Sequence, residues 1–125
     1  MIYTTYFGKL KKLPKHIHPI SICGKAPDWW TGKQYKKLAP KYDFFMKWKE
    51  THDNDYYIKH YENEVLKSLN AVEVVANLKH LCEESTYSNV DIALVCYEKP
   101  EDFCHRHLVS KWLNNNGFEC KEWSE

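Results

Sequence analysis

Residues 90–106 read VDIALVCYEKPEDFCHR, and this stretch decides the fold. Its first eight residues are apolar except for Asp91, which is typical of a central strand covered on both faces. A short loop around Pro100 follows, and an amphipathic helix is then expected over residues 103–116. A buried strand followed directly by a helix is the unit from which α/β sheets are built.

The flanking sequence adds further elements to this unit. Strands are expected at residues 2–6, 17–23 and 118–123, and helical segments at residues 33–39, 43–52, 57–69 and 71–82. The order strand, strand, helices, central strand, helix, strand predicts α/β architecture. We expect a single three-layer domain over residues 1–125, with a partly parallel central sheet flanked by helices.

Composition bounds the class of protein. The chain has 125 residues, of which 43% are hydrophobic, so a disordered chain is excluded. The longest apolar run, residues 92–97, is far too short to span a membrane. The N-terminus shows no basic segment followed by an apolar one, so no signal peptide is expected. With five cysteines, an odd number, we expect reduced thiols and a cytoplasmic location.

Charge is distributed unevenly along the chain. Residues 1–49 hold eleven lysines and two acidic residues, whereas residues 50–125 hold seven basic and fifteen acidic residues. Such a split can create a basic face that attracts a phosphate-bearing ligand, although the two halves can also neutralise each other in the fold. Arg106 is the single arginine of the chain, and its planar fork binds carboxylate or phosphate in a way that lysine does not.

Two strand ends carry notable side chains. One is the segment 23–25, Cys-Gly-Lys, and the other is the segment 96–100, which leads into Cys104. In open α/β sheets, ligands bind beyond the carboxyl ends of the strands. If the two strands are parallel neighbours, the loops after Cys23 and Cys96 face one pocket.

The segment 94–106 resembles the signature of the domain of unknown function 488 family, in which a strand ends in Cys-x-Glu and Cys-His-Arg opens a helix. Trp48, the stretch 57–66 and the segment 117–120 are also similar to that family. Many relatives carry Asp-x-Arg after the second strand, where this chain has the segment 22–25, so Lys25 is at best a partial substitute. The resemblance implies an α/β fold and names no function.

The start of the helix after Phe103 is a candidate anion site. Helix N-termini offer free N–H groups and the positive end of the dipole. Arg106 could clamp an anion there with His105 beside it. The alternative is that Arg106 pairs with a structural carboxylate such as Glu98.

Cys104 is a candidate nucleophile, because a thiol near a helix N-terminus, His105 and Arg106 ionises more easily than an isolated one. Glu98 is the second catalytic candidate. The alternative for Cys104 is a place in the core, since it shares an apolar stripe with Leu108 and Trp112.

A metal site is a weaker hypothesis. Cys96, Cys104, His105 and Cys23 could converge on an ion. However, the chain has no Cys-x2-Cys or His-x3-His pair, which zinc sites usually show. We therefore assign no metal ligand and no cofactor from the sequence.

The aromatic loop near residue 30 could hold a ring. Trp29, Trp30 and Tyr35 lie among lysines, including Lys25, and aromatic faces beside cations suit a stacked base with its phosphate. The alternative is that the two tryptophans plug one end of the sheet.

The sequence thus favours binding of a small anionic, nucleotide-derived ligand, with Arg106, His105, Cys96, Lys25, Trp29, Trp30 and Tyr35 as ligand-binding residues. Such a protein would be a sensor or would sequester its ligand; in a phage it would capture a host defence signal. One alternative is a thiol- or carboxylate-dependent enzyme that hydrolyses or transfers a group on a nucleotide or nucleic acid. Another, not favoured, is a nucleic-acid module that uses the basic half of the chain. No membrane partner is expected.

Overall fold

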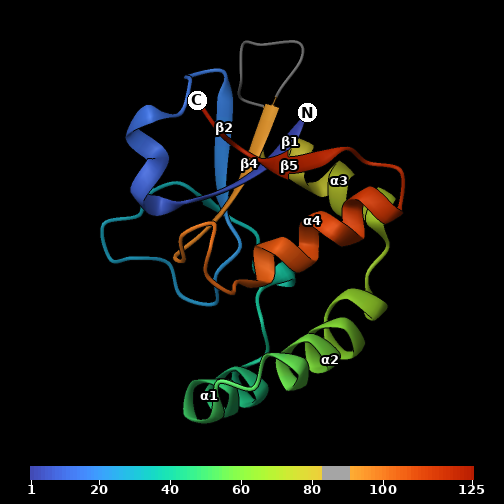
Figure 1. Cartoon of the computed structure of the whole chain (residues 1–125). Coiled ribbons are helices and arrows are strands. Elements are labelled where there is room, and N and C mark those ends of the chain that lie inside the picture. The colour runs from blue at the N-terminus through green and yellow to red at the C-terminus, as the bar shows by residue number, and fades with distance from the viewer. Residues whose placement is uncertain (83–90) are drawn as a thin grey trace.

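The computed structural model describes residues 1–82 and 91–125. Within these residues the strands form one sheet in the order β3-β2-β4-β1-β5, and every neighbouring pair is parallel (Figure 1). The strands are β1 Ile2–Tyr6, β2 Ile17–Ser21, β3 Lys33–Gln34, β4 Asp91–Cys96 and β5 Cys120–Glu122. The prediction of a single α/β domain with parallel strands is confirmed, and the sheet is parallel throughout.

Strand β4 is the centre of the sheet, as its apolar sequence predicts. Its side chains alternate between two faces, so that Ile92 and Leu94 point into one core and Ala93 and Val95 into two smaller clusters on the other side. Each of these four residues is at most 1% exposed. The expected start of this strand, Val90, lies outside the described residues.

The helices differ from the expected ones mainly at their ends. They are α1 Tyr42–Thr51, α2 Asn54–Glu64, α3 Ala71–His80 and α4 His105–Asn115, with short 3-10 helices η1 Phe7–Lys12, η2 Lys36–Leu38 and η3 Leu66–Ser68. The expected helix over residues 33–39 is instead β3 followed by η2. The expected helix over residues 57–69 starts earlier, because Asp53 caps the backbone N–H of Tyr56, and it ends at Glu64.

The two faces of the sheet are covered by different layers. All four α-helices contribute to the large core, which contains Phe44, Tyr61, Val75 and Val109. On the other face the covering layer is η1 with neighbouring loops, which contribute residues such as Phe7, Leu10, Leu13 and Trp30. Figure 1 shows η1 on the opposite side of the sheet from α3 and α4.

Helix α4 begins later than its sequence suggests. Cys104 is its N-cap with extended backbone angles (φ −155°, ψ 144°), and Phe103 precedes the helix. The acidic residues Glu101 and Asp102 therefore lie outside the first turn, which leaves the N-terminal end of the helix to Cys104 and His105. Gly117, with a φ of 86°, follows the helix in the left-handed conformation that favours glycine.

The topology marks one end of the sheet as a ligand-binding place. After β2 the chain moves outward to β3, whereas after β4 it crosses in the opposite direction to β5. Ligands of open α/β sheets bind at such a switch point, at the carboxyl ends of the diverging strands. Within the described residues no helix is long and apolar enough to cross a membrane.

Candidate functional site

The loops after β2 and β4 meet at the switch point, as expected for parallel neighbours. The backbone N–H of Ile22 donates to the carbonyl of Val95 at 3.1 Å, and the thiol of Cys23 donates to the same oxygen at 3.7 Å. Cys23 packs there against Cys96 and Cys104 in a cluster that also contains Phe7. Cys23 thus joins two cysteines that are more than seventy residues further along the chain at one end of the sheet.

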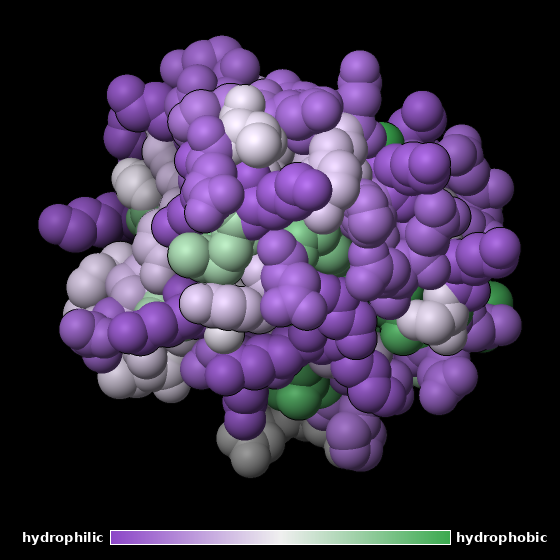
Figure 2. Space-filling view, turned by 90° about the horizontal axis from the view of Figure 1, so that it is seen from below, coloured by the Kyte–Doolittle hydropathy of each residue, from purple (hydrophilic) through white to green (hydrophobic). Residues whose placement is uncertain are grey.

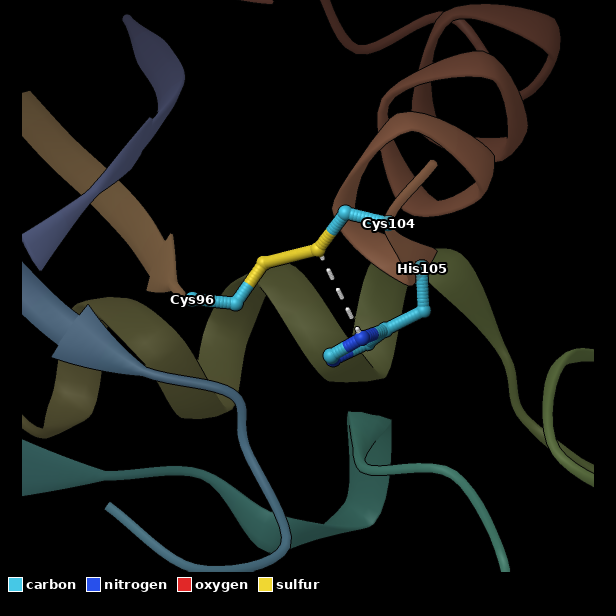
Figure 3. Close-up of side chains that lie close together, drawn as sticks. All are labelled: Cys96, Cys104 and His105. Carbon is cyan, nitrogen blue, oxygen red and sulfur yellow. Dashed lines mark hydrogen bonds between the residues drawn. A yellow bond between two sulfur atoms is a disulfide. The ribbon is translucent and has the colours of Figure 1, made fainter. Parts of the chain in front are cut away.

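Cys96, the last residue of β4, and Cys104, the N-cap of α4, are joined by a disulfide (Figure 3). The sequence led us to expect five reduced thiols, and the structure places two of the sulfur atoms in contact. The Cα atoms of the pair are 7.6 Å apart, beyond the usual disulfide span of about 4.4–6.8 Å, so this spacing also suits the reduced pair. A strand end and a helix start close a short loop here, and a count of cysteines cannot show that contact. Cys23, Cys82 and Cys120 are free and buried.

His105 is held in one tautomer. Its Nε2 lies 2.8 Å from the carbonyl oxygen of Ile22, which can only accept, so Nε2 carries the hydrogen. Nδ1 is then a bare lone pair, and it faces the Sγ of Cys104 at 3.8 Å. Burial lowers the pKa of His105 to about 4, an effect to which the nearby charges of Arg106 and His107 add. The ring is therefore neutral at ordinary pH.

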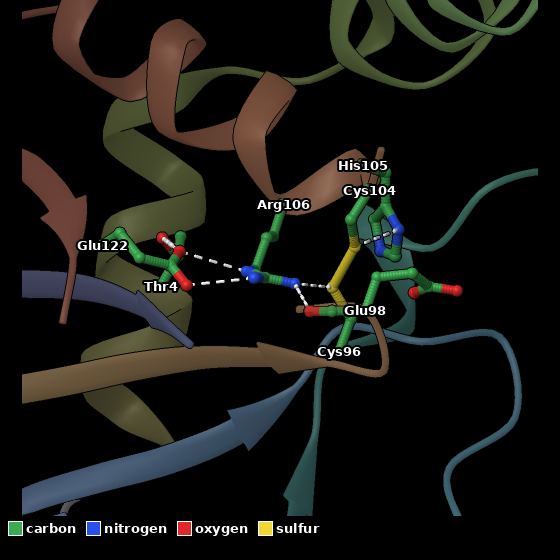
Figure 4. Close-up of polar contacts among 7 residues, drawn as sticks. All are labelled: Thr4, Cys96, Glu98, Cys104, His105, Arg106 and Glu122. Atoms are coloured by element: carbon green, nitrogen blue, oxygen red, sulfur yellow. Dashed lines mark hydrogen bonds and ion pairs between the residues drawn. A yellow bond between two sulfur atoms is a disulfide. The ribbon is translucent and has the colours of Figure 1, made fainter. Parts of the chain in front are cut away.

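Arg106 is fully buried, and its guanidinium is held on three sides (Figure 4). Nε and Nη2 donate to the two carboxylate oxygens of Glu122 at 3.1 and 2.9 Å. Nη1 donates to the backbone carbonyl of Glu98 at 2.6 Å and to the Sγ of Cys96 at 3.4 Å. Four of the five N–H donors of the side chain are therefore engaged.

Glu122 is fixed from its other side by β1. Thr4 lies opposite Glu122 in the parallel pairing of β1 and β5, and its hydroxyl donates to Oε1 at 2.6 Å. Of the two alternatives for Arg106, the structure thus shows a carboxylate partner, and that partner is Glu122. The Glu98 side chain turns away from the guanidinium in Figure 4.

Beside Cys104 and His105 lies a small cavity of about 20 Å³. This is room for one water molecule. The cavity is bounded by the Glu98 side chain and by four aromatic rings, namely Phe45, Trp48, Tyr57 and Phe103. The adjacent face, seen from the side of α1 and α2, is mostly hydrophilic (Figure 2). A planar group could enter between these rings only if the cavity widened.

The aromatic loop is divided between burial and exposure. Trp30 packs onto the cysteine cluster, as a plug of the sheet would, and Trp29 is 62% exposed and in edge contact with Phe7. Tyr35 is buried in the large core, where its hydroxyl accepts a hydrogen bond from Asn77 of α3. The structure therefore does not bring Tyr35 together with the two tryptophans.

Lys25 stands at the rim of the site. Its side chain is exposed, and its backbone carbonyl accepts a hydrogen bond from the hydroxyl of Tyr97 at 2.6 Å. This bond ties the loop after β2 to the loop after β4.

A larger groove lies elsewhere, between η2, the start of α1 and the end of α2. It has a volume of about 340 Å³, and Lys36, Lys37 and Lys41 line it. None of the three lysines forms an ion pair with a residue of the described ranges 1–82 and 91–125. Glu64, which also lines the groove, pairs with His60. The groove thus has a positive wall.

Sequence reasoning missed the residues that complete the site. Thr4 and Glu122 lie in short strands outside the Cys-His-Arg segment, and three of the four aromatic rings come from α1 and α2. One signal was present: Cys120 and Glu122 are two residues apart in a strand and share a face. Glu122 therefore faces the same side as the buried Cys120, and a carboxylate in such a place needs a positively charged partner. Arg106 is the natural candidate.

The cysteines and His105 also form a possible ligand set for a metal ion. The Sγ atoms of Cys96 and Cys104 and one ring nitrogen of His105 lie within 4.8 Å of one another, and all three residues are buried. Cys23 is not part of this set.

Residues 8–117 match the family DUF488-N3a, described as the active DUF488-N3 subclade. The chain belongs to this family. The match contains the strand end, the loop and the Cys-His-Arg helix start, so the resemblance seen in the sequence is confirmed. No curated protein and no solved structure matches the chain.

Proposed function

We propose that this DUF488-N3a protein is a cysteine-dependent enzyme in which Cys104 is the nucleophile and His105 the general base. The observation that carries the proposal is the contact between the Cys104 Sγ and the bare Nδ1 of a neutral His105. A nucleophile, a base and a group that orients the base form the usual arrangement of covalent catalysis. Here the orienting group is the Ile22 carbonyl.

The chemistry requires the reduced form of the site. His105 Nδ1 takes the proton of the Cys104 thiol as the thiolate attacks an electrophilic carbon of the substrate. A bond forms between Sγ and that carbon, and the bond to the leaving group breaks. The leaving group takes the proton from His105. Water then attacks the carbon with His105 as base, and Sγ departs with a proton restored.

Two features of the site support a ring-bearing substrate such as a nucleotide or a nucleic-acid base. The aromatic rings around the cavity offer stacking faces, and base–aromatic stacking contributes about 1–3 kcal/mol per base. Glu98, whose side chain bounds the same cavity, can hydrogen-bond to a ring or a leaving group. The cavity must open for such a ring to enter. The cell's cytoplasm would keep the two thiols reduced.

The test compares the reduced wild type with Cys104→Ser, His105→Gln and the control Cys120→Ser, whose cysteine is buried in β5. Turnover of nucleotides, nucleosides and short single strands is followed by mass spectrometry, together with the rate at which iodoacetamide alkylates each thiol between pH 5 and 10. We expect the control to match the wild type and Cys104→Ser to lose turnover. Cys104 should also react at lower pH than Cys120, whose pKa is raised by burial, and His105→Gln should shift the Cys104 profile to higher pH. Full turnover in Cys104→Ser, or identical alkylation profiles for Cys104 and Cys120, would overturn the proposal.

A second candidate, binding of an anionic nucleotide-derived ligand without turnover, is favoured by the lysine groove. The groove is large enough for a phosphate-bearing ligand, and its three lysines are not neutralised by described carboxylates. Arg106 supports this candidate less, because Glu122 occupies its fork. Charge reversal at Lys37 and Lys41 should abolish a thermal shift caused by such a ligand, whereas Cys104→Ser should not change it. A shift that persists in the charge-reversed variant would exclude the groove.

Long nucleic acid is the other possible occupant of the lysine groove. Its binding would weaken steeply as salt is added, because each neutralised phosphate releases a counterion. A small ligand would show a much milder salt dependence.

A further inference from the structure

We infer that the reduced site binds one zinc ion through the Sγ atoms of Cys96 and Cys104 and the Nδ1 atom of His105. These three atoms already lie within 4.8 Å of one another, although they come from the end of β4 and the start of α4. Two thiolates and an imidazole match the preference of zinc for sulfur and nitrogen ligands. The inference rests on this geometry and does not depend on the proposed enzymatic function.

The spacing fits tetrahedral coordination. Ligands at 2.3 Å for sulfur and about 2.05 Å for nitrogen stand roughly 3.6 Å apart around a tetrahedral zinc ion. The separation between the Cys104 Sγ and the His105 Nδ1 is 3.8 Å, close to this value. The two sulfur atoms must move apart to roughly 3.8 Å, once their bond is reduced, to make room for the ion.

The surroundings of His105 are those of a metal ligand. Such a histidine commonly donates its second ring N–H to a backbone carbonyl, which fixes the tautomer and points the other nitrogen at the metal. The bond from Nε2 to the Ile22 carbonyl at 2.8 Å has this form.

Charge in the site also balances. Zinc with two thiolates and a neutral imidazole has no net charge, so the Arg106–Glu122 pair remains compensated within itself. The N–H of Arg106 that reaches the Cys96 Sγ at 3.4 Å would then donate to a metal-bound thiolate. Such outer hydrogen bonds orient and support the ligands of a metal ion.

The three protein ligands leave the fourth position open. Cys104 and His105 both border the small cavity, which holds about one water molecule, so a water is the natural fourth ligand. A zinc ion bound here uses the lone pair of the Cys104 sulfur, which nucleophilic attack on a substrate would need. The metal-bound form is therefore expected to resist alkylation.

Formation of the site is a balanced reaction. A trialkylphosphine and water convert the Cys96–Cys104 disulfide into two thiols and a phosphine oxide. Zinc then binds the two sulfur atoms and the His105 nitrogen, and both thiol protons are released to the solvent.

The experiment uses the full chain. The protein is reduced with a trialkylphosphine, which is then removed under anaerobic conditions. The protein is titrated with Zn²⁺ and, separately, with Co²⁺, whose thiolate charge-transfer absorption counts sulfur ligands. The variants are Cys96→Ser, Cys104→Ser and His105→Gln, and the matched control is Cys120→Ser. Circular dichroism checks that each variant is folded.

We expect one metal ion per wild-type or control chain, with cobalt spectra typical of two thiolates. Each ligand variant should bind zinc at least about 100-fold more weakly, at or beyond the loss seen on removing an outer partner. Zinc should also protect Cys104 from iodoacetamide. Sub-stoichiometric binding by the reduced wild type, or equal affinity in the folded ligand variants, would overturn the inference. The proposed enzymatic function is tested separately, in the metal-free protein. It fails if Cys104 there is alkylated no faster than Cys120.

Discussion

Arg106 and Glu122 form a two-bonded ion pair that links the start of α4 to the edge strand β5. Nε and Nη2 of the arginine, a residue with no exposed surface, donate to the two carboxylate oxygens at 3.1 and 2.9 Å. The same guanidinium reaches Cys96 and the Glu98 carbonyl, so it also fixes the loop that leads to Cys104. The pair therefore holds the start of α4 and the loop before it in place.

We predict that Glu122→Gln and Arg106→Ala destabilise the fold. Removing one partner leaves the other buried without compensation, which costs about 3–5 kcal/mol for a fully buried pair. Glu122 keeps a 26% exposed side chain, so we expect Glu122→Gln to lose only about 2 kcal/mol. Urea unfolding of the reduced protein measures both losses.

The control for this pair is Lys111→Ala, an exposed position on the same helix. It should change stability by less than about 0.5 kcal/mol. If Glu122→Gln unfolds at the same urea concentration as the control, the ion pair does not hold the site in place.

The sequence predicted the parts of the fold that depend on local pattern. The buried strand β4 and the helix α4 that follows it both agree with the expectation from residue type and spacing. The residues of the candidate site that belong to the Cys-His-Arg segment were found in the same way. Each of these features is determined within about fifteen residues of chain.

The rest depends on contacts between distant segments. Glu122 meets Arg106 because β5 lies beside β1, and Tyr35 enters the core through its contact with α3. Cys96 and Cys104 are only eight residues apart, but their contact depends on the path of the loop between them. The segment 33–39 was predicted as helix, but its first two residues pair with β2 and a single 3-10 turn follows. Tertiary pairing outweighs weak local preference in such short segments.

We predict that burial of His105 makes stability depend on pH in the acidic range. The folded-state pKa is about 4, below the ordinary value of 6.5, so only the unfolded chain takes up the proton between these values. Stability contributed by the neutral ring is complete above pH 6.5 and is lost as the pH falls toward 4. A difference of this size is worth roughly 3 kcal/mol.

Urea unfolding of wild type and His105→Gln at pH 7, 6, 5 and 4 checks this expectation. The amide of glutamine can still donate to the Ile22 carbonyl but does not titrate. The difference in free energy of unfolding between the two proteins should shrink as the pH falls. Burial also lowers the pKa of His107, but this contribution is present in both proteins and cancels in the difference. A difference that is constant with pH contradicts a buried neutral His105.

We predict that Cys23 is unreactive although it lies beside the site. Burial raises the pKa of its thiol to about 11, and the nearby Glu98 charge acts in the same direction. At pH 8 its thiolate fraction is then on the order of 100-fold below that of an ordinary cysteine. Alkylation of the folded, reduced protein followed by peptide mapping measures this. Modification of Cys23 as fast as of an unfolded control peptide would contradict the burial.

The aromatic wall of the cavity should control access to Cys104 by size. The cavity holds about one water molecule, and Phe103 is one of the rings that close it. In the reduced wild type we therefore expect iodoacetamide to alkylate Cys104 much faster, relative to its rate with a free thiol, than a bulky aromatic maleimide does. Phe103→Ala removes one wall, so the two normalised rates should converge in that variant. Phe45→Ala, which removes a ring contributed by α1, serves as a second opening of the same cavity. If discrimination by size survives in both variants, the route to the Cys104 sulfur does not pass between these rings.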